Sequence, residues 1–185
     1  MERIQKSSMR MKVFIEDLLE LSQVSAKPKN YYLVSLSTVV AEVLSDLELK
    51  IKEKKAKVII HSLPEIMGDK LQMRQLFQNL LSNALKFQRK EIPVEIIISS
   101  QRGERGHWRI LLQDNGIGIA PENIDRIFKP FERLHGRSTY EGTGIGLAIC
   151  KNIAQRHHGT IAVENIASPG ACFTINLPER QPVQS

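Results

Sequence analysis

Apolar residues at the start of the chain recur at the seven-residue spacing of a helix that pairs with other helices. The seam consists of Ile4, Ser7, Met11, Phe14, Leu18 and Leu21. This pattern predicts a helical segment over residues 1–27. Pro28 lies between two lysines and ends the pattern, because proline interrupts a helix. We therefore expect a linker over residues 28–32.

Three longer helices are predicted in the rest of the chain. The first runs from about Ser35 to Lys57 and has a continuous apolar stripe. The stripe contains Val39, Val40, Val43, Leu44, Leu47 and Ile51. The second runs from Asp69, a residue type that caps helices, to about Phe87. The third runs from Leu147 to His157 or His158, and Gly159 ends it.

Short runs of branched and aromatic residues predict five strands. The strands are expected at 58–60, 92–100, 107–113, 160–164 and 171–177. A polar, glycine-rich stretch over 116–146 separates the third strand from the third helix and contains one short helix near 121–127. Helices and strands alternate unevenly, so a two-layer α/β sandwich fits better than a doubly wound parallel sheet. The tail over 179–185 is expected to be loose.

Composition excludes several classes of protein. The chain has 185 residues and 42% hydrophobic residues, ordinary values for a globular protein. No apolar run approaches the roughly 20 residues of a membrane helix. The two cysteines, Cys150 and Cys172, offer no disulfide framework, and we expect buried thiols in a cytoplasmic protein.

The net charge of +6 raises the alternative of a nucleic-acid-binding domain. Much of the basic excess lies between Lys50 and Lys57, where it mixes with Glu48 and Glu53 on a predicted helix. A solvated helix face explains this mixture, and no aromatic residues alternate with the lysines to stack on bases. We therefore expect no nucleic-acid partner, whereas salt-dependent DNA binding would support one.

A row of polar side chains lies along one face of the second long helix. Asn79 and Asn83 are four residues apart, Lys86 is three further on, and Gln75 extends the row. Neutral amide oxygens suit a magnesium ion that already carries phosphates, and an ammonium offsets phosphate charge. An exposed polar helix face is the alternative interpretation.

Two glycine-containing loops add further candidate chemistry. Asp114 enters a turn with Gly116 and Gly118, where a carboxylate could accept the exocyclic amine of adenine, although a plain turn explains the same residues. The loop from Gly142 to Gly146 precedes a helix, and free amides there favour phosphate. Neither the dinucleotide fingerprint nor the P-loop spacing is present.

Four clusters, in their order and spacing, resemble the N, G1, F and G2 boxes of the histidine kinase catalytic domain. The clusters are Gln75–Phe87, Asp114–Gly118, Phe128–Phe131 and Gly142–Leu147. The domain belongs to the superfamily that includes gyrase, heat-shock chaperone and mismatch-repair ATPases. The resemblance implies a Bergerat-type ATP-binding fold over 33–178, preceded by the C-terminal part of a dimerisation and phosphotransfer hairpin over 1–27.

The resemblance also implies a site for ATP or ADP with Mg2+. Its residues are Asn79, Asn83, Lys86, Phe87, Asp114, Gly116, Gly118, Ile119, Gly142, Thr143, Gly144, Ile145, Gly146 and Leu147. Asn83 is expected to bind magnesium, Asn79 to join the metal and phosphate shell, and Lys86 to contact phosphate. A lid is expected over 119–141. Its basic residues could reach the phosphates or could equally be solvated, and they are Arg133, His135 and Arg137.

The resemblance implies a kinase more than a hydrolase. Asn79 stands where hydrolysing relatives have a glutamate general base, and an amide cannot accept a proton from water at neutral pH. The γ-phosphate is then kept for a histidine on the hairpin, and no histidine precedes residue 30. A hydrolysing ATPase and a non-catalytic nucleotide-sensing module are the alternatives.

The resemblance further implies a homodimer in the full-length protein and a response-regulator receiver domain as partner. The parent could be membrane-anchored or soluble. One departure from the family lies near the last strand, where Gly170-Ala171-Cys172-Phe173 replaces the usual Gly-Thr-Thr-Phe. Any hydrogen bond that the family's threonine hydroxyls make near adenine is absent here.

Overall fold

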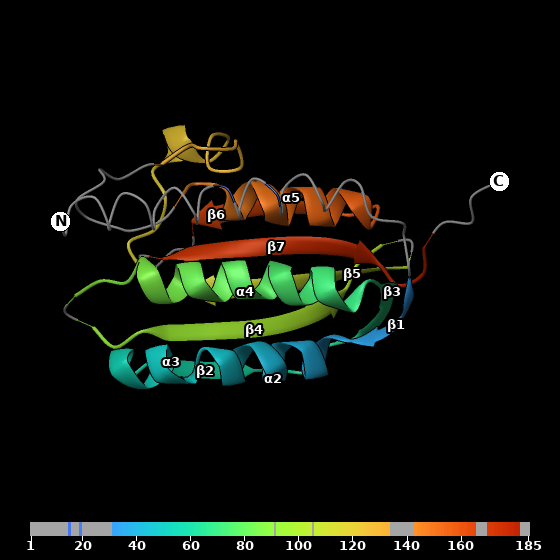
Figure 1. The fold of residues 1–185 in the computed structure, drawn as a ribbon, viewed down its shortest axis with the longest axis horizontal. Helices are drawn as coiled ribbons and strands as arrows, with labels where there is room; N and C mark the ends of the chain where they lie inside the picture. Colours follow the sequence, from blue (N-terminus) through green and yellow to red (C-terminus); the bar gives the residue numbers. More distant parts are fainter. Residues whose placement is uncertain are drawn as a thin grey trace.

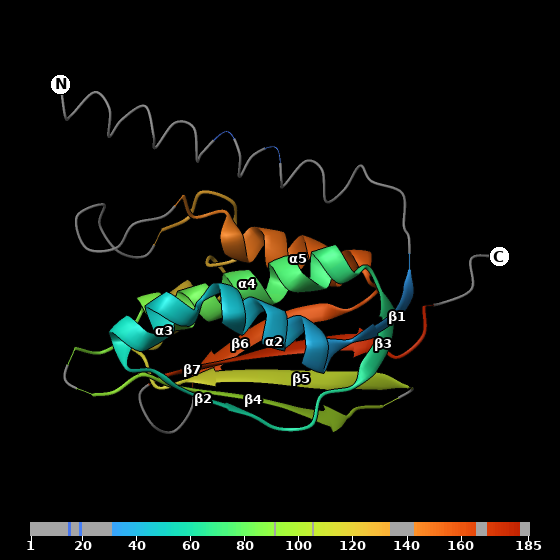
Figure 2. The same ribbon diagram turned by 60° about the horizontal axis from the view of Figure 1, so that its bottom comes forward.

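The computed structural model describes residues 15, 19, 31–90, 92–104, 106–133, 143–165 and 170–181. Of the predicted N-terminal helix, Ile15 and Leu19 are described, and both are helical and exposed. The rest of that helix, its seam and residues 28–30 of the linker lie outside the described residues. Within the described part, the chain forms a sheet with helices packed on one face (Figures 1 and 2).

The main sheet has five strands in the order β2-β4-β5-β7-β6. They are β2 (Lys57–Ile60), β4 (Glu95–Arg102), β5 (His107–Asp114), β6 (Thr160–Asn165) and β7 (Ala171–Pro178). The β2–β4 pair is parallel, and the other neighbours are antiparallel. All five predicted strands are present, with boundaries that differ by up to three residues.

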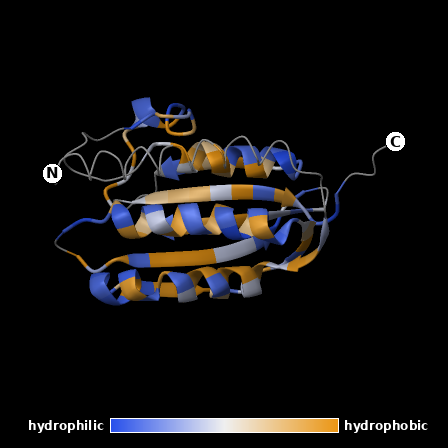
Figure 3. Ribbon diagram, viewed as in Figure 1, coloured by the Kyte–Doolittle hydropathy of each residue, from blue (hydrophilic) through white to orange (hydrophobic). Residues whose placement is uncertain are grey.

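The helices that cover the sheet are α2 (Leu36–Asp46), α3 (Glu48–Lys54), α4 (Lys70–Lys86) and α5 (Gly146–Arg156). All lie on the same side of the sheet (Figure 2). The predicted two-layer α/β sandwich is therefore confirmed. Figure 3 shows hydrophobic and hydrophilic residues alternating along α4, as expected for a helix with one buried side.

The core lies between the two layers. In β4, Ile96 and Ile98 face the helices, as do Ile110 and Leu112 in the neighbouring strand β5. None of these four side chains has exposed surface. Truncating one such side chain to alanine typically costs about 2–5 kcal/mol. The sheet is thus a stiff platform on which α4 and α5 are fixed.

The first long helix is divided in two, whereas the sequence predicts one helix over 35–57. Leu47, with φ −93° and ψ 4°, separates α2 from α3. Leu47 is buried and Ile51 packs against the core, so the apolar stripe is continuous although the helix is not. Lys55 then adopts a left-handed conformation with φ 49° and ends α3 before β2.

A second, two-stranded sheet was not predicted. β1 (Tyr32–Ser35) pairs antiparallel with β3 (Glu65–Gly68). Each strand has four residues, and they are about 30 residues apart in the chain, so no local turn signals the pairing. Ser35 then serves as the N-cap of α2 by accepting a hydrogen bond from Thr38 N.

Two further differences concern the ends of elements. The predicted helix near 121–127 is a single 3-10 turn over Pro121–Asn123. After α5 ends at Arg156, His158 adopts the left-handed conformation that was expected of a glycine, and Gly159 is required for another reason. A Cβ on Gly159 would lie 2.1 Å from Asn176 O.

The predicted loose tail is also wrong for its first residues. Met67 N donates to Glu179 O at 2.9 Å, and Gln181 Nε2 donates to Met67 O at 2.6 Å. Through these hydrogen bonds, β3 contacts the residues that follow Pro178, the last residue of β7. Residues 182–185 lie outside the described part of the chain.

Buried His157 connects the start of α4 with the end of α5. Its Nε2 accepts from Asp69 N at 3.1 Å, so its Nδ1 carries the proton and donates to Ile153 O at 2.8 Å. Tyr31 packs on the ring at 4.9 Å between centroids and donates its hydroxyl to Arg156 O at 2.6 Å. Burial lowers the pKa of His157, which keeps the ring neutral.

Candidate functional site

The predicted site residues of α4 lie in its last two turns. Asp69 caps the start of the helix by accepting from Leu71 N at 2.9 Å and Gln72 N at 3.2 Å, which confirms the predicted cap. Apolar residues bury the sides of the helix that face α2 and α5. Asn83 and Lys86 lie outside this packed part of the helix and line a cavity beside the sheet.

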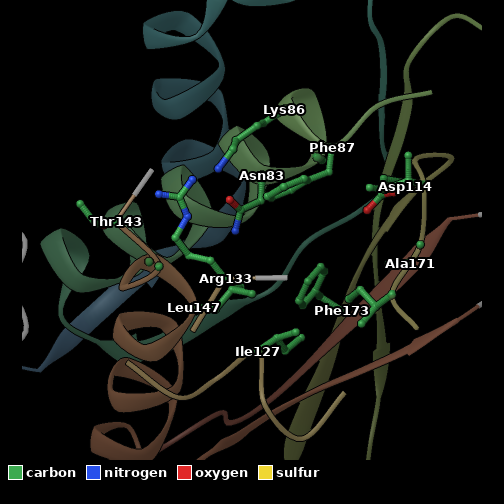
Figure 4. Close-up of a pocket in the computed structure, with 16 residues that line it drawn as sticks. Asn83, Lys86, Phe87, Asp114, Ile127, Arg133, Thr143, Leu147, Ala171 and Phe173 are labelled. Atoms are coloured by element: carbon green, nitrogen blue, oxygen red, sulfur yellow. The ribbon is translucent and has the colours of Figure 1, made fainter. Parts of the chain in front are cut away.

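The cavity has a volume of about 250 Å³ and lies between α4, α5, the end of β5 and the start of β7 (Figure 4). Its lining residues are Asn83, Ala84, Lys86, Phe87, Asp114, Ile117, Gly118, Ile119, Ile127, Arg133, Thr143, Gly144, Gly146, Leu147, Ala171 and Phe173. Figure 4 shows Lys86 and Arg133 converging near Asn83, with Asp114 at the other end beside Ala171. Apolar side chains separate the cationic end from the acidic end.

Asp114 supplies the acidic end. Gly116 N donates to its Oδ1 at 2.8 Å, and the backbone N–H of Ala171 also hydrogen-bonds to the carboxyl group. Burial raises the pKa of Asp114, and these two hydrogen bonds oppose the rise. A half-buried carboxyl group that lines a cavity is an acceptor suited to an N–H group on a ligand.

The turn that follows Asp114 is fastened to the end of α4. Ile117 N donates to Phe87 O at 3.0 Å, and a Cβ on Gly116 would lie 2.4 Å from the same oxygen. Glycine at 116 therefore permits the close approach of the two backbones. Asn115 secures the other side of the turn, because its Oδ1 accepts from Glu95 N at 2.9 Å.

The cationic end is built around the start of α5. Gly144 has φ +81°, and a Cβ there would lie 2.7 Å from Glu132 O, so glycine is required on both counts. Gly146 begins α5, which has no side-chain cap at its N-terminus. The first amides of an uncapped helix form an anion site, and Lys86 and Arg133 add two cationic side chains beside it.

The structure brings most of the predicted site residues together around this cavity. The predicted residues that line it are Asn83, Lys86, Phe87, Asp114, Gly118, Ile119, Arg133, Thr143, Gly144, Gly146 and Leu147. Gly116 and Ile145 do not line it: the former supports the turn and the latter is fully buried. Gly142, His135 and Arg137 lie outside the described residues.

Asn79 takes a different position from Asn83. It does not line the cavity, and its Oδ1 would lie 3.3 Å from a Cβ on Gly146. Its Nδ2 is buried and makes no hydrogen bond of standard geometry, although the amide is close enough to oppose the pKa rise of the Cys150 thiol. Burial dominates and raises the pKa of Cys150 to about 12. In this position Asn79 packs at the α4–α5 contact, one helical turn from the cavity.

Five lining residues were not predicted. They are Ala84, Ile117, Ile127, Ala171 and Phe173. Ala171 and Phe173 are two residues apart on β7, so their side chains lie on the same face of the sheet, the one that the helices cover. Ala171 pairs with Asp114 of β5. The period of β7 could have indicated which side chains face the helices, but the pairing with Asp114 depends on strand order, which the sequence does not show.

The expectation for the two cysteines agrees with the structure. Both cysteines are free thiols and are buried, as predicted. Among the described residues, no group of three or more His, Cys, Asp and Glu side chains could hold a metal ion. Over the same residues, no helix has both the length and the apolar character to span a bilayer.

Comparisons with known proteins agree with this geometry. A sequence profile described as "Histidine kinase-, DNA gyrase B-, and HSP90-like ATPase" matches residues 68–181. Cyanobacterial phytochrome A of Nostoc sp. strain PCC 7120 is 41% identical over 168 residues, which cover 91% of this chain and 22% of the phytochrome. The chain thus spans about a fifth of the length of this and similar curated relatives.

Two solved structures share the fold. Full-length ShkA in complex with AMPPNP gives a TM-score of 0.80 at 22% identity, over 99% of this chain and 39% of ShkA. Histidine kinase ThkA, in complex with the response regulator protein TrrA, gives a TM-score of 0.71 at 22% identity. That match covers 95% of this chain and 49% of ThkA.

Proposed function

The chain belongs to the family of histidine kinase-, DNA gyrase B- and HSP90-like ATPases, and from this membership we propose that it is the ATP-binding kinase domain of a sensor histidine kinase. The observation that carries the proposal is the polarity of one cavity. Half-buried Asp114 lies at one end, and Asn83, Lys86 and the start of α5 lie at the other.

The cavity suits an adenine nucleotide. The Asp114 carboxyl group would accept a hydrogen bond from the 6-amino group of adenine, whereas guanine has a carbonyl oxygen at that position. Apolar contacts from Ile119, Leu147 and Phe173 would cover the base. The phosphates would then extend toward Lys86 and the first amides of α5, where both the ammonium and the helix dipole favour negative charge.

The donor set at the phosphate end also fits Mg2+. Asn83 offers a neutral amide oxygen in the cavity, and a hard cation with phosphate oxygens and water as its other ligands requires few protein groups. Bound there, magnesium would neutralise phosphate charge during transfer. Asn79 could join this shell only through a shift of its side chain, since it does not line the cavity.

The residues present favour phosphate transfer over hydrolysis. Among the described residues that line the cavity, Asp114 is the one carboxyl group, and it lies at the end opposite Lys86. Among the described lining residues no general base is thus placed beside the phosphates to activate water, and Asn79 cannot act as one. The contribution of the chain is to position the γ-phosphate and to offset its charge while a histidine imidazole attacks.

The acceptor and the partners follow from the same proposal. The accepting histidine would belong to a phosphotransfer hairpin whose C-terminal part is residues 1–27, joined by the linker 28–32 to the catalytic domain 33–178. Dimerisation would occur through that hairpin, and the receiver domain of a response regulator would take the phosphate. The ThkA–TrrA complex supports this kind of partner. We place the domain in the cytoplasm, where ATP is available.

Two other functions differ from this one in measurable ways. A hydrolysing ATPase would release phosphate steadily from Mg-ATP, and a nucleotide-sensing module would bind nucleotide with no transfer. We expect this chain to bind Mg-ATP and to release little phosphate from it, because none of the described lining residues is placed to activate water as a base.

Isothermal titration calorimetry with Mg-ATP, ADP and GTP, together with a phosphate-release assay, tests the proposal. We expect adenine nucleotides to bind, GTP to bind at least tenfold more weakly, and phosphate release to stay near the blank. Equal affinity for GTP and ATP, or rapid phosphate release, would contradict the assignment.

A further inference from the structure

Lys86 and Phe87, the last residue of α4 and its C-cap, form a pair inside the cavity. The Lys86 ammonium lies 4.4 Å from the centroid of the Phe87 ring. Both residues line the cavity and both are half-buried. The Lys86 ammonium and the Asn83 side chain lie close together in Figure 4, so the cation is over the ring and also at the phosphate end.

The backbone of Phe87 is held from two sides. Phe87 N donates to Asn83 O at 2.9 Å, and Phe87 O accepts from Ile117 N at 3.0 Å. A Cβ on Gly116 would lie 2.4 Å from Phe87 O, so the turn after Asp114 runs close beside this carbonyl. The ring therefore projects from a backbone that is tied to both the base end and the phosphate end of the cavity.

Such a fixed ring constrains the long side chain next to it. A lysine has four rotatable bonds, and much of its conformational freedom is lost when its ammonium binds a ligand. A ring face attracts the ammonium and limits that freedom before the ligand arrives. The half-buried location strengthens the attraction, because solvent screens it less than at a fully exposed site.

We propose that Phe87 is a positioning residue for Lys86: its ring holds the ammonium at the phosphate end of the cavity and so favours nucleotides that carry a polyphosphate over the nucleoside. The inference rests on the proposed nucleotide site and assigns a role within it. Phe87 acts through Lys86, whereas a ring that only packed against the base would act on adenosine and ADP alike.

The two roles predict different results in a double-mutant cycle. The variants are Phe87→Leu, Lys86→Met and the double variant, and the ligands are ADP and adenosine, measured by calorimetry. Leucine keeps an apolar side chain at position 87 but has no ring face, and methionine keeps the length of lysine without its charge. Phe87→Tyr is the matched control, because tyrosine retains the face.

We expect Phe87→Leu to weaken ADP binding about three- to tenfold, from the range measured for cation–π pairs. Adenosine binding should change less than twofold. Phe87→Tyr should bind ADP as the wild type does. In the Lys86→Met background, Phe87→Leu should change ADP affinity less than twofold, since no ammonium remains to be held.

Equal losses from Phe87→Leu in both backgrounds would overturn the inference, as would an equal loss for adenosine and ADP. Thermal unfolding shows whether each variant is folded. If Phe87→Leu is misfolded, Phe87→Met replaces it in the same cycle. A wild-type chain that binds neither ATP nor ADP would contradict the proposed function itself and is thereby distinguished from a failure of this inference.

Discussion

At the residue scale, Asp114 carries the selectivity of the proposed site. Its carboxyl group is half-buried, and partial burial raises its pKa, so the group is costly to keep ionised. Backbone hydrogen bonds from Gly116 and Ala171 reduce that cost. Such an arrangement stabilises a ligand amine more than it stabilises the fold.

We predict that Asp114→Asn weakens Mg-ATP binding at least tenfold while leaving thermal stability unchanged or higher. The asparagine oxygen can still accept from Gly116, but its NH2 group can instead face the adenine amine, and two donors then oppose each other. Calorimetry and a melting curve measure the two effects. Glu164→Gln, on an exposed residue of β6, is the matched control; equal ATP affinity in both variants would reject the adenine role.

His157 gives a second residue-scale prediction, on pH. Its folded-state pKa is lowered by burial, so the unfolded chain binds a proton more readily than the folded chain. The free energy of unfolding should therefore be greatest above the ordinary histidine pKa of about 6.5. It should fall as the pH drops below that value, because protonation removes the acceptor for Asp69 N.

Urea unfolding between pH 7.5 and pH 5 measures this dependence. His157→Gln should flatten the slope relative to the wild type, although it lowers stability at every pH through lost packing. Parallel slopes for the two proteins would show that other groups set the pH dependence.

The sequence predicted residues whose roles are local. Asp69 as a cap, Asp114 before a glycine turn, and the polar spacing from Asn83 to Lys86 all depend on neighbours within a few residues. Ala171 and Phe173 could not be predicted as lining residues, because they reach the cavity through pairing between distant strands. The position of Asn79 depends on how close α5 approaches α4, which is also a tertiary property.

At the element scale, α5 is fixed at both ends. Its start forms the phosphate end of the cavity, and its end is held by His157 and by the approach of β7 to Gly159. Runs of branched and aromatic residues predicted the five main strands, and residues typical of helix ends, Asp69 and Gly159, helped to place α4 and α5. The short strands β1 and β3 and the bend at Leu47 were missed, because tertiary packing decides them and no residue type marks them.

We predict that Gly159→Ala destabilises the domain by at least about 2 kcal/mol. The new methyl group would lie 2.1 Å from Asn176 O, so α5 or β7 must move. Chemical denaturation gives the change in the free energy of unfolding. Gly106→Ala is the matched control, since φ is +73° but nothing lies within 4 Å of its Cβ, and it should cost about 1–2 kcal/mol.

If Gly159→Ala proved no more destabilising than Gly106→Ala, the close approach of β7 to the end of α5 would not constrain the fold. A loss of nucleotide affinity in Gly159→Ala, measured at a temperature where the variant is folded, would show that a displacement at the C-terminal end of α5 also changes its N-terminal end at the proposed nucleotide site.

At the scale of the whole molecule, the described chain is a rigid sheet with two helices that span from the proposed nucleotide site to the opposite end. At that end, Tyr31, which lies within the predicted linker, packs on His157 and donates its hydroxyl to Arg156 O. The point where the chain enters the domain is thus fixed to the ends of α4 and α5. A hairpin that precedes residue 31 would be held through this contact.

The central claim is that this chain transfers phosphate to a histidine and does not hydrolyse ATP. The most direct test mixes the chain with γ-labelled Mg-ATP and a separate hairpin that carries the acceptor histidine. We predict acid-labile label on the hairpin, none on the chain itself, and loss of labelling in Asp114→Asn. Free phosphate without labelled hairpin, or label on one of the chain's own histidines, would contradict the claim.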